Sequence, residues 1–155
     1  MTPALQRPRP PIVIAGDGPR LIDLAARRGD AWNTLGGQPM RGRGAAAVPL
    51  DEAISATSRR VALLEKACER IGRDPRTLRR MLLAYRVSPD LFLSGDAFTD
   101  YVGRYRDVGV DEFVFYWPVD PGSFARMPAY EEALERIASE VIPALRAASP
   151  DRPSR

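Results

Sequence analysis

A strand–turn–helix–strand pattern in residues 11–37 limits what this chain can fold into more than any other stretch. Residues 12–14 read Ile-Val-Ile, a β-branched run that is typical of a buried parallel strand. Gly16 and Gly18 follow, and glycine lets the backbone turn sharply and approach a ligand closely. Pro19 suits the first turn of a helix, because its missing N–H would have no intrahelical partner there. The pattern predicts a parallel βαβ unit.

The helix after this turn is expected to bury one side. Leu21, Leu24 and Ala25 form its apolar stripe, and Gly29 stands where a helix should end. Residues 30–35 then form a second strand. The N-terminus of such a helix can bind an anion, although most turns between a strand and a helix contain glycine for geometry alone.

Beyond residue 37 the sequence predicts further helices and strands in alternation. A loop rich in glycine and proline at 36–49 comes first. Apolar residues spaced by three or four then predict helices, and β-branched or aromatic runs predict strands. In chain order these are a helix at 51–71, a strand at 81–87, a helix at 94–108, a strand at 113–117 and a helix from 129 that Pro143 should kink. The result is an α/β domain of about four βα units at 11–147, with an extended segment at 1–10 and a disordered tail at 148–155.

The long helix at 51–71 has an apolar stripe and a charged side. The stripe consists of Ile54, Thr57, Val61, Leu64, Cys68 and Ile71. Arg59, Arg60, Glu65, Lys66, Glu69 and Arg70 lie off it, and we expect them to face water.

Composition argues against several classes of function. The net charge is +3 with a pI near 9.4, but the arginines alternate with acidic residues and form no basic stripe of the kind that nucleic acids require. No apolar run approaches the roughly 20 residues of a membrane span, and residues 1–10 do not resemble a secretory signal. These features favour a cytoplasmic protein without nucleic-acid or membrane partners.

Metal binding and disulfide chemistry also find little support. The chain has no histidine, which removes the commonest general base and the commonest metal ligand. Cys68 is the single cysteine, so an internal disulfide is excluded, and the sequence predicts no metal site.

Four phrases, in order, resemble the luciferase-like flavin-dependent oxidoreductases, a family that includes deazaflavin-dependent members. The phrases are PIVIAGDG with LAA and GDAWN within 11–33, GRDP at 72–75, GVDEFVFYWP at 109–118 and IPALR at 142–146. Ala15 and Ala31 stand where glycine is common in the family, and alanine at 31 would matter if that position needed a positive φ. The resemblance covers about residues 8–147 and corresponds to the C-terminal half of the family's barrel.

The resemblance implies a partial (β/α) barrel, about half of a TIM-type barrel of eight units. It also implies that FMN or a deazaflavin lies at the carboxyl ends of the strands. The residues matched to the cofactor-binding side are Ala15, Gly16, Asp17, Gly18, Arg20 and Asn33. Like charges repel, so the Asp17 carboxylate must point away from a phosphate or bind ribityl hydroxyls, and Arg20 could compensate its charge. The family's substrate contacts come largely from early strands, so no catalytic residue is named.

Four strands on their own expose two edges and an apolar inner face. The inner face is expected to include Ile12, Ile14, Trp32, Leu82, Ala84, Val114 and Tyr116. We expect a second copy or a separately encoded N-terminal half-barrel to cover this face, or the strands to flatten into an open sheet. The resemblance thus implies the C-terminal half of a flavin- or deazaflavin-dependent oxidoreductase, a monooxygenase or a dehydrogenase, which supplies the phosphate-binding side for the cofactor and is inactive without the N-terminal half. The alternative is a non-catalytic half-barrel that acts as a binding or interaction module, or a truncated remnant.

Overall fold

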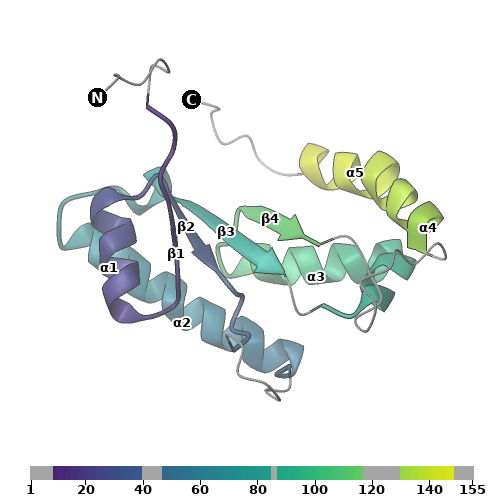
Figure 1. The fold of residues 1–155 in the computed structure, drawn as a ribbon, viewed down its shortest axis with the longest axis horizontal. Helices are drawn as coiled ribbons and strands as arrows, with labels where there is room; N and C mark the ends of the chain where they lie inside the picture. Colours follow the sequence, from purple (N-terminus) through teal and green to yellow (C-terminus); the bar gives the residue numbers. More distant parts are fainter. Residues whose placement is uncertain (1–8, 40–46, 85–86, 117–129, 149–155) are drawn as a thin grey trace, which may run out of the picture. The chain divides into compact units, whose positions relative to one another are not determined.

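The computed structural model describes residues 9–39, 47–84, 87–116 and 130–148, and within them four strands alternate with helices (Figure 1). The strands are β1 (Val13–Ala15), β2 (Ala31–Thr34), β3 (Arg79–Ala84) and β4 (Glu112–Phe115). The α-helices are α1 (Pro19–Arg28), α2 (Leu50–Glu69), α3 (Gly95–Asp107), α4 (Glu131–Arg136) and α5 (Ile142–Ala147). Shorter helical segments are η1 (Pro75–Thr77), η2 (Pro89–Leu93) and the π-helical η4 (Ile137–Val141). The predicted order of elements is confirmed, whereas the segments predicted at 1–10 and 148–155 lie almost wholly outside the described residues.

The strands form one parallel sheet in the order β1-β2-β3-β4. Each strand pairs with the strand next in sequence, as in a section of a (β/α) barrel. Ile14 lies beside Trp32, and Trp32 lies beside Arg80, while Asn33 lies between Ala15 and Met81. Because paired residues in a parallel sheet point to the same side, these two rows belong to opposite faces.

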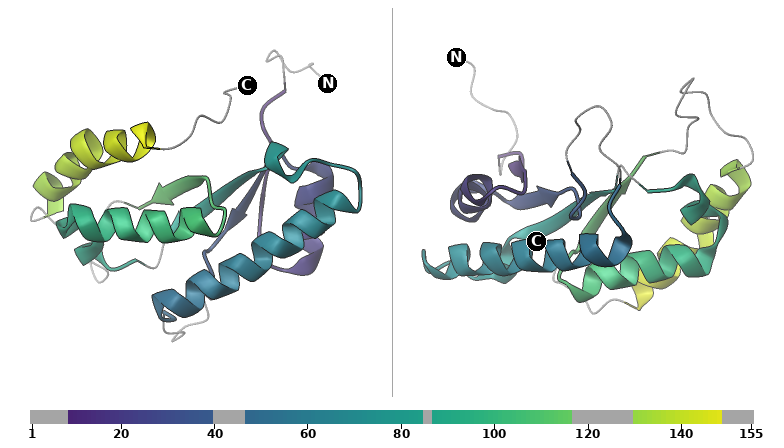
Figure 2. Two further views of the ribbon diagram at one scale, coloured as in Figure 1. Left: turned by 180° about the vertical axis from the view of Figure 1, so that it is seen from behind. Right: turned by 90° about the horizontal axis from the view of Figure 1, so that it is seen from below.

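The core lies between one face of this sheet and the helices α1 and α2, which pack side by side (Figures 1 and 2). Trp32 of β2 is fully buried there. The other members come from both helices and from the residue that precedes β3: Ile22, Ala25, Ala26, Val61, Leu64, Ala67, Cys68 and Leu78. The predicted stripe of the long helix is thus confirmed at Thr57, Val61, Leu64 and Cys68.

The predicted inner face of the sheet is wrong for four of its members. Trp32, Leu82 and Ala84 are buried on the face that the helices cover, and Ile14, which lies beside Trp32, packs partly buried against the same core. The opposite face, called the open face below, carries Val13, Asn33, Met81, Leu83 and Val114. Val13 is 45% exposed and Val114 is 40% exposed, so among the described residues of the first unit this face is exposed on its two outer strands, whereas Ala31 of β2 is buried. The prediction of an exposed apolar face therefore stands, with Val114 as predicted but with other side chains from β1, β2 and β3.

The predicted stripe of α1 is also wrong in part. Ala25 is buried, but Leu21 and Leu24 are 41% and 42% exposed, and Ile22 and Ala26 take the inward positions. Ile12, ahead of the edge strand β1, is exposed as well. An apolar surface thus remains on α1 and at the β1 end of the sheet.

The Gly-Arg-Asp-Pro phrase at 72–75 has a structural role. Nη1 of Arg73 donates to the carbonyl oxygens of Ala26 at 2.8 Å and Gly29 at 2.9 Å, so it caps the end of α1. Asp74 accepts from the Arg76 backbone N–H at 2.9 Å and begins η1. The phrase joins the end of α2 to the end of α1 before β3 begins.

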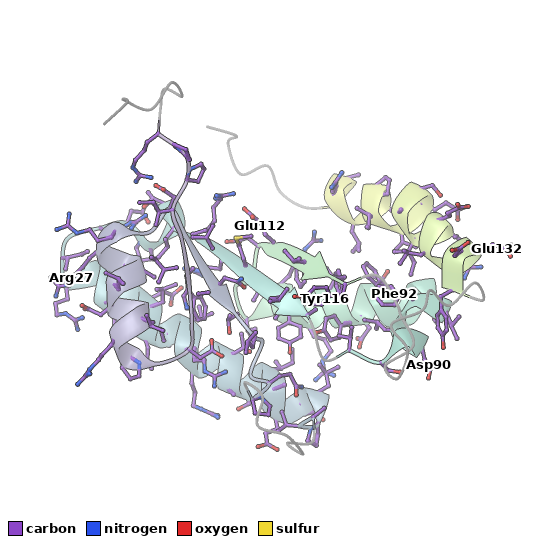
Figure 3. All side chains as sticks on the ribbon, viewed as in Figure 1. Arg27, Asp90, Phe92, Glu112, Tyr116 and Glu132 are labelled. Atoms are coloured by element: carbon purple, nitrogen blue, oxygen red, sulfur yellow. The ribbon has the colours of Figure 1, made fainter. Side chains whose placement is uncertain are left out.

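The chain divides into two compact units. The first comprises 1–86 with 105–115 and therefore contains the sheet, α1 and α2; the second comprises 87–104 with 116–155. In the second, the Phe92 and Phe98 rings lie 6.1 Å apart between centroids, and the Tyr130 hydroxyl donates to Asp90 at 3.0 Å. Both Asp90 and Phe92 lie on η2 (Figure 3).

The last helix of the second unit is irregular where the sequence predicted a kink. Pro143 lies in the first turn of α5, directly after the π-helical η4. Proline lacks the N–H that would continue the helix, and a π-helical turn is one way to accommodate this break. None of the helices in the described parts of the chain has the length and apolar character needed to cross a lipid bilayer.

Candidate functional site at the carboxyl ends of β1 and β2

The turn from Gly16 to Gly18 connects β1 to α1 at the carboxyl edge of the sheet, where the sequence placed the cofactor. Gly16 has φ +139°, and a Cβ there would lie 2.3 Å from Cδ1 of Leu21, so only glycine fits. Gly18 is the N-cap of α1 with φ −78°, and a Cβ there would meet no described atom within 4 Å. Gly16 is needed for the conformation of the turn, and Gly18 leaves the N-terminus of α1 free of side-chain atoms.

The main chain of this turn is fixed to β2. The Gly16 N–H donates to the Asn33 carbonyl oxygen at 3.0 Å, and the Trp32 indole N–H donates to the Gly16 carbonyl oxygen at 2.8 Å. Since Trp32 is buried in the core, its hydrogen bond anchors the turn to the core of the unit.

Asp17 points toward the sheet and α2. Its Oδ1 accepts from the Thr34 hydroxyl at 2.6 Å, and its Oδ2 lies 3.3 Å from Nη1 of Arg60. The Thr34 oxygen in turn accepts from the Gly36 N–H at 3.1 Å. The Asp17 carboxylate is thus held by Thr34 and Arg60.

The first residues after β2 are fitted closely against neighbouring elements. Gly36 and Gly37 have φ values of +63° and +81°, and a Cβ on Gly37 would lie 2.2 Å from the Ala53 carbonyl oxygen of α2. The Tyr105 hydroxyl donates to the Gly36 carbonyl oxygen at 2.7 Å. The two glycines are therefore needed for close packing at this edge.

The N-terminus of α1 offers donors to an anion. The N–H groups of Gly18 and Arg20 donate to no other described group, and the first turn contains no acidic residue. The Arg20 side chain is exposed and makes no ion pair or hydrogen bond with another described residue. Backbone donors and a free guanidinium at a helix N-terminus favour a phosphate or a carboxylate.

Asn33 lies on the open face between Ala15 and Met81. Its Oδ1 is buried and has no hydrogen-bond partner among the described residues. A buried amide oxygen without a donor costs free energy, so this side chain is suited to accept a hydrogen bond from a group outside the described chain. Ala31 belongs to β2 and pairs with Val13, so its extended backbone suits alanine and the departure from glycine has no structural cost.

Sequence reasoning placed Arg60 in water, and that prediction is wrong. Nη1 of Arg60 is buried beside Asp17. Two other charged residues of the same stretch are also paired: Glu65 forms an ion pair with the buried Arg80 at 2.9 Å, and Arg70, just after α2, pairs with Asp23 at 2.6 Å. The helical period does not reveal these contacts, because each partner comes from a distant part of the sequence.

Other ionisable groups in this unit are explained by structure alone. Burial raises the pKa of the Cys68 thiol, which disfavours the reactive thiolate. Asp30 accepts from Arg9 at 2.6 Å and from the Ile12 N–H at 2.6 Å, and these bonds lower the pKa of its carboxyl group. Asp30 precedes β2 and so lies at the edge opposite the turn.

Solved structures of known enzymes share this fold. An F420-dependent secondary alcohol dehydrogenase in complex with an F420-acetone adduct matches with a TM-score of 0.62 and 16% identity, over 90% of this chain and 50% of that chain. The coenzyme F420-dependent tetrahydromethanopterin reductase from Methanopyrus kandleri matches with a TM-score of 0.56 and 13% identity, over 86% and 50%. The chain has the fold of half a luciferase-like TIM barrel.

This half-barrel spans about half the length of both enzyme chains. No family profile matches its sequence, and no curated protein matches it either. The likeness therefore lies in the fold, which agrees with the resemblance drawn from the four sequence phrases.

Proposed function

We propose that this half-barrel is the C-terminal, phosphate-binding half of an oxidoreductase that uses a deazaflavin or FMN. The observation that carries the proposal is the glycine turn at the carboxyl end of β1, within a fold shared with two F420-dependent enzymes. F420 is a deazaflavin, so the comparisons favour a deazaflavin over FMN. Ligands of barrel enzymes bind at the carboxyl ends of the strands, where this turn lies.

The residues present fit a cofactor with a phosphorylated tail. The N–H groups of Gly18 and Arg20 would donate to phosphate oxygens, and the Arg20 guanidinium would add positive charge. Ala15 and Gly16 keep the approach free of large side chains, and Asn33 offers a polar contact on the open face. Asp17 belongs to the site through its backbone, because Thr34 and Arg60 hold its carboxylate. A bound deazaflavin or flavin would supply hydride chemistry, while these residues bind and orient it.

The other wall of the barrel must come from further βα units. Val13 and Val114 on the open face are exposed, and so are Leu21 and Leu24 on α1. In a closed barrel the interior is filled by side chains from all eight strands. We propose that a second copy or a separately encoded N-terminal half-barrel covers this surface. Sedimentation of the purified chain tests the first option, and a compact monomer would contradict it.

The phosphate site is tested by equilibrium binding of FMN and riboflavin, which differ by the phosphate, and of F420. The wild-type chain should bind FMN more tightly than riboflavin. Arg20→Gln should weaken FMN binding several-fold and leave riboflavin unchanged. Arg28→Gln is the matched control, because it removes the same charge from the other end of α1. If the wild-type chain bound neither FMN nor F420 more tightly than riboflavin, the phosphate site would be refuted.

A non-catalytic interaction module or a remnant is the second candidate. The exposure of Val13 and Val114 favours it, since an uncovered apolar face fits a protein partner as well as it fits the rest of a barrel. It predicts self-association or partner binding without any affinity for FMN or F420. Cofactor binding by the chain, alone or with a second half-barrel, would exclude the purely structural alternative.

A further inference from the structure

We propose that Thr34 and Arg60 are positioning residues for the anion site, with separate tasks. Thr34 fixes the geometry of the Gly16–Gly18 turn through Asp17, and Arg60 cancels the negative charge of Asp17. The inference rests on the proposed phosphate site and adds two residues to which the sequence gave no role.

The contact between Thr34 and Asp17 is a short hydrogen bond of 2.6 Å. Thr34 is buried, and its oxygen also accepts from the Gly36 N–H, so its hydroxyl is fixed at both ends. The bond ties the middle residue of the turn to the end of β2. Together with the two main-chain anchors of Gly16, it holds the turn in place before any ligand arrives.

The contact between Arg60 and Asp17 is of a different kind. Nη1 of Arg60 lies 3.3 Å from Oδ2 of Asp17, and the two atoms form an ion pair without hydrogen-bond geometry. The two side chains are only 25% and 18% exposed, so water screens their charges less than at the surface. Because Asp17 precedes the N-cap of α1, its charge without Arg60 would oppose an anion at the helix N-terminus.

The division of tasks separates the variants by experiment. In Arg60→Met the Thr34 bond remains and the charge of Asp17 is uncompensated, so FMN should bind several-fold more weakly than to wild type. Asp17→Asn in the same chain removes that charge and should restore FMN binding. Thr34→Val should shift the amide resonances of Gly16, Asp17 and Gly18 and weaken FMN binding by loss of geometry. Arg60→Lys, which keeps the charge, should bind FMN nearly as wild type does.

A second readout needs no ligand. Hydroxide-catalysed exchange of an exposed amide hydrogen slows where the local potential becomes more negative. The N–H groups of Gly18 and Arg20 donate to no other described group, so NMR can follow their exchange. Arg60→Met should slow both exchanges several-fold, and the Arg60→Met/Asp17→Asn double variant should return them to wild-type rates. Arg59→Met is the control, since Arg59 is exposed on the same helix and bonds only Ser55 among the described residues.

The two proposals fail in different ways. If the wild-type chain binds neither FMN nor F420 more tightly than riboflavin, the phosphate site is wrong, while the amide exchange still decides the role of Arg60. If Arg60→Met leaves the exchange of Gly18 and Arg20 unchanged, or if the double variant is as slow as Arg60→Met, the charge-cancelling role is wrong. If Thr34→Val leaves the turn resonances in place, the geometric role of Thr34 is wrong.

Discussion

The two faces of the sheet differ in what they contact. The covered face carries Trp32 and Leu82, both fully buried against helices or strands of the same unit. The open face carries Val13 and Val114, each more than a third exposed. The same four strands thus have one face packed in a hydrophobic core and one face with apolar side chains exposed to solvent.

The difference teaches where the stability of the chain arises. Removal of apolar surface from water is the main favourable term in folding, and here it is concentrated on the helix side of the sheet. Side chains on the open face contribute little to the folding of a single copy. Their apolar character is explained if a further set of strands covers them, as in a closed barrel.

The largest effect should come from the covered face. Trp32→Ala removes a fully buried indole and the hydrogen bond to Gly16, and we expect a loss of about 3–5 kcal/mol in the free energy of unfolding. Val114→Ala on the open face should cost less than about 1 kcal/mol. Urea denaturation of both variants measures the two losses in the free energy of unfolding. Losses of similar size would contradict the difference between the two faces.

The next effect tests whether the close packing reaches the carboxyl edge. Gly37→Ala forces a Cβ into the Ala53 backbone of α2 at a φ of +81°, and we expect a loss of at least about 2 kcal/mol. Gly72→Ala is matched in φ, at +71°, but its Cβ would meet no described atom, so about 1 kcal/mol should be lost. Thermal unfolding compares the two, and equal losses would mean that strain alone acts at both.

A charge on the open face should change association more than folding. Val114→Glu places a carboxylate on an exposed position, so the free energy of unfolding should change by less than about 0.5 kcal/mol. Sedimentation velocity should show that any dimer of the wild-type chain is lost. A loss of 2 kcal/mol or more in the monomer would show that the chain itself covers this face.

The smallest effect lies at the opposite edge. The bonds from Arg9 and Ile12 lower the pKa of Asp30 from its ordinary value of 3.8. A lowered pKa in the folded state adds stability above the unfolded value, and that stability is lost as the pH falls through the folded value. Asp30→Asn should therefore make the fall in the free energy of unfolding below about pH 4 less steep. It should leave the Gly16–Gly18 turn unaffected at neutral pH. Unfolding curves across acidic pH measure this, and an unchanged slope would contradict it.

Local signals predicted the elements well. The run at 12–14, the glycine turn and Pro19 located β1 and the start of α1, because strand, turn and helix preferences act within a few residues. The stripe through Val61 and Leu64 located α2 for the same reason.

The faces of the strands were harder to predict. In a parallel sheet both sides of a strand are apolar, so the sequence alternation does not tell which side the helices cover. The sequence therefore placed Trp32 and Leu82 on the wrong face, and it buried Leu21 of α1, which is exposed. The partnership of Arg60 with Asp17 was missed because a single sequence records no contact between distant residues.

The cap that Arg73 places on α1 has a consequence for how the polypeptide acquires its shape. Carbonyl groups at the end of the first helix find their donor in a side chain encoded after the second helix. A ribosome-bound product that stops short of position 73 would leave those oxygens to solvent. The first βα unit therefore gains its full set of hydrogen bonds only after α2 and the turn that follows it have been synthesised.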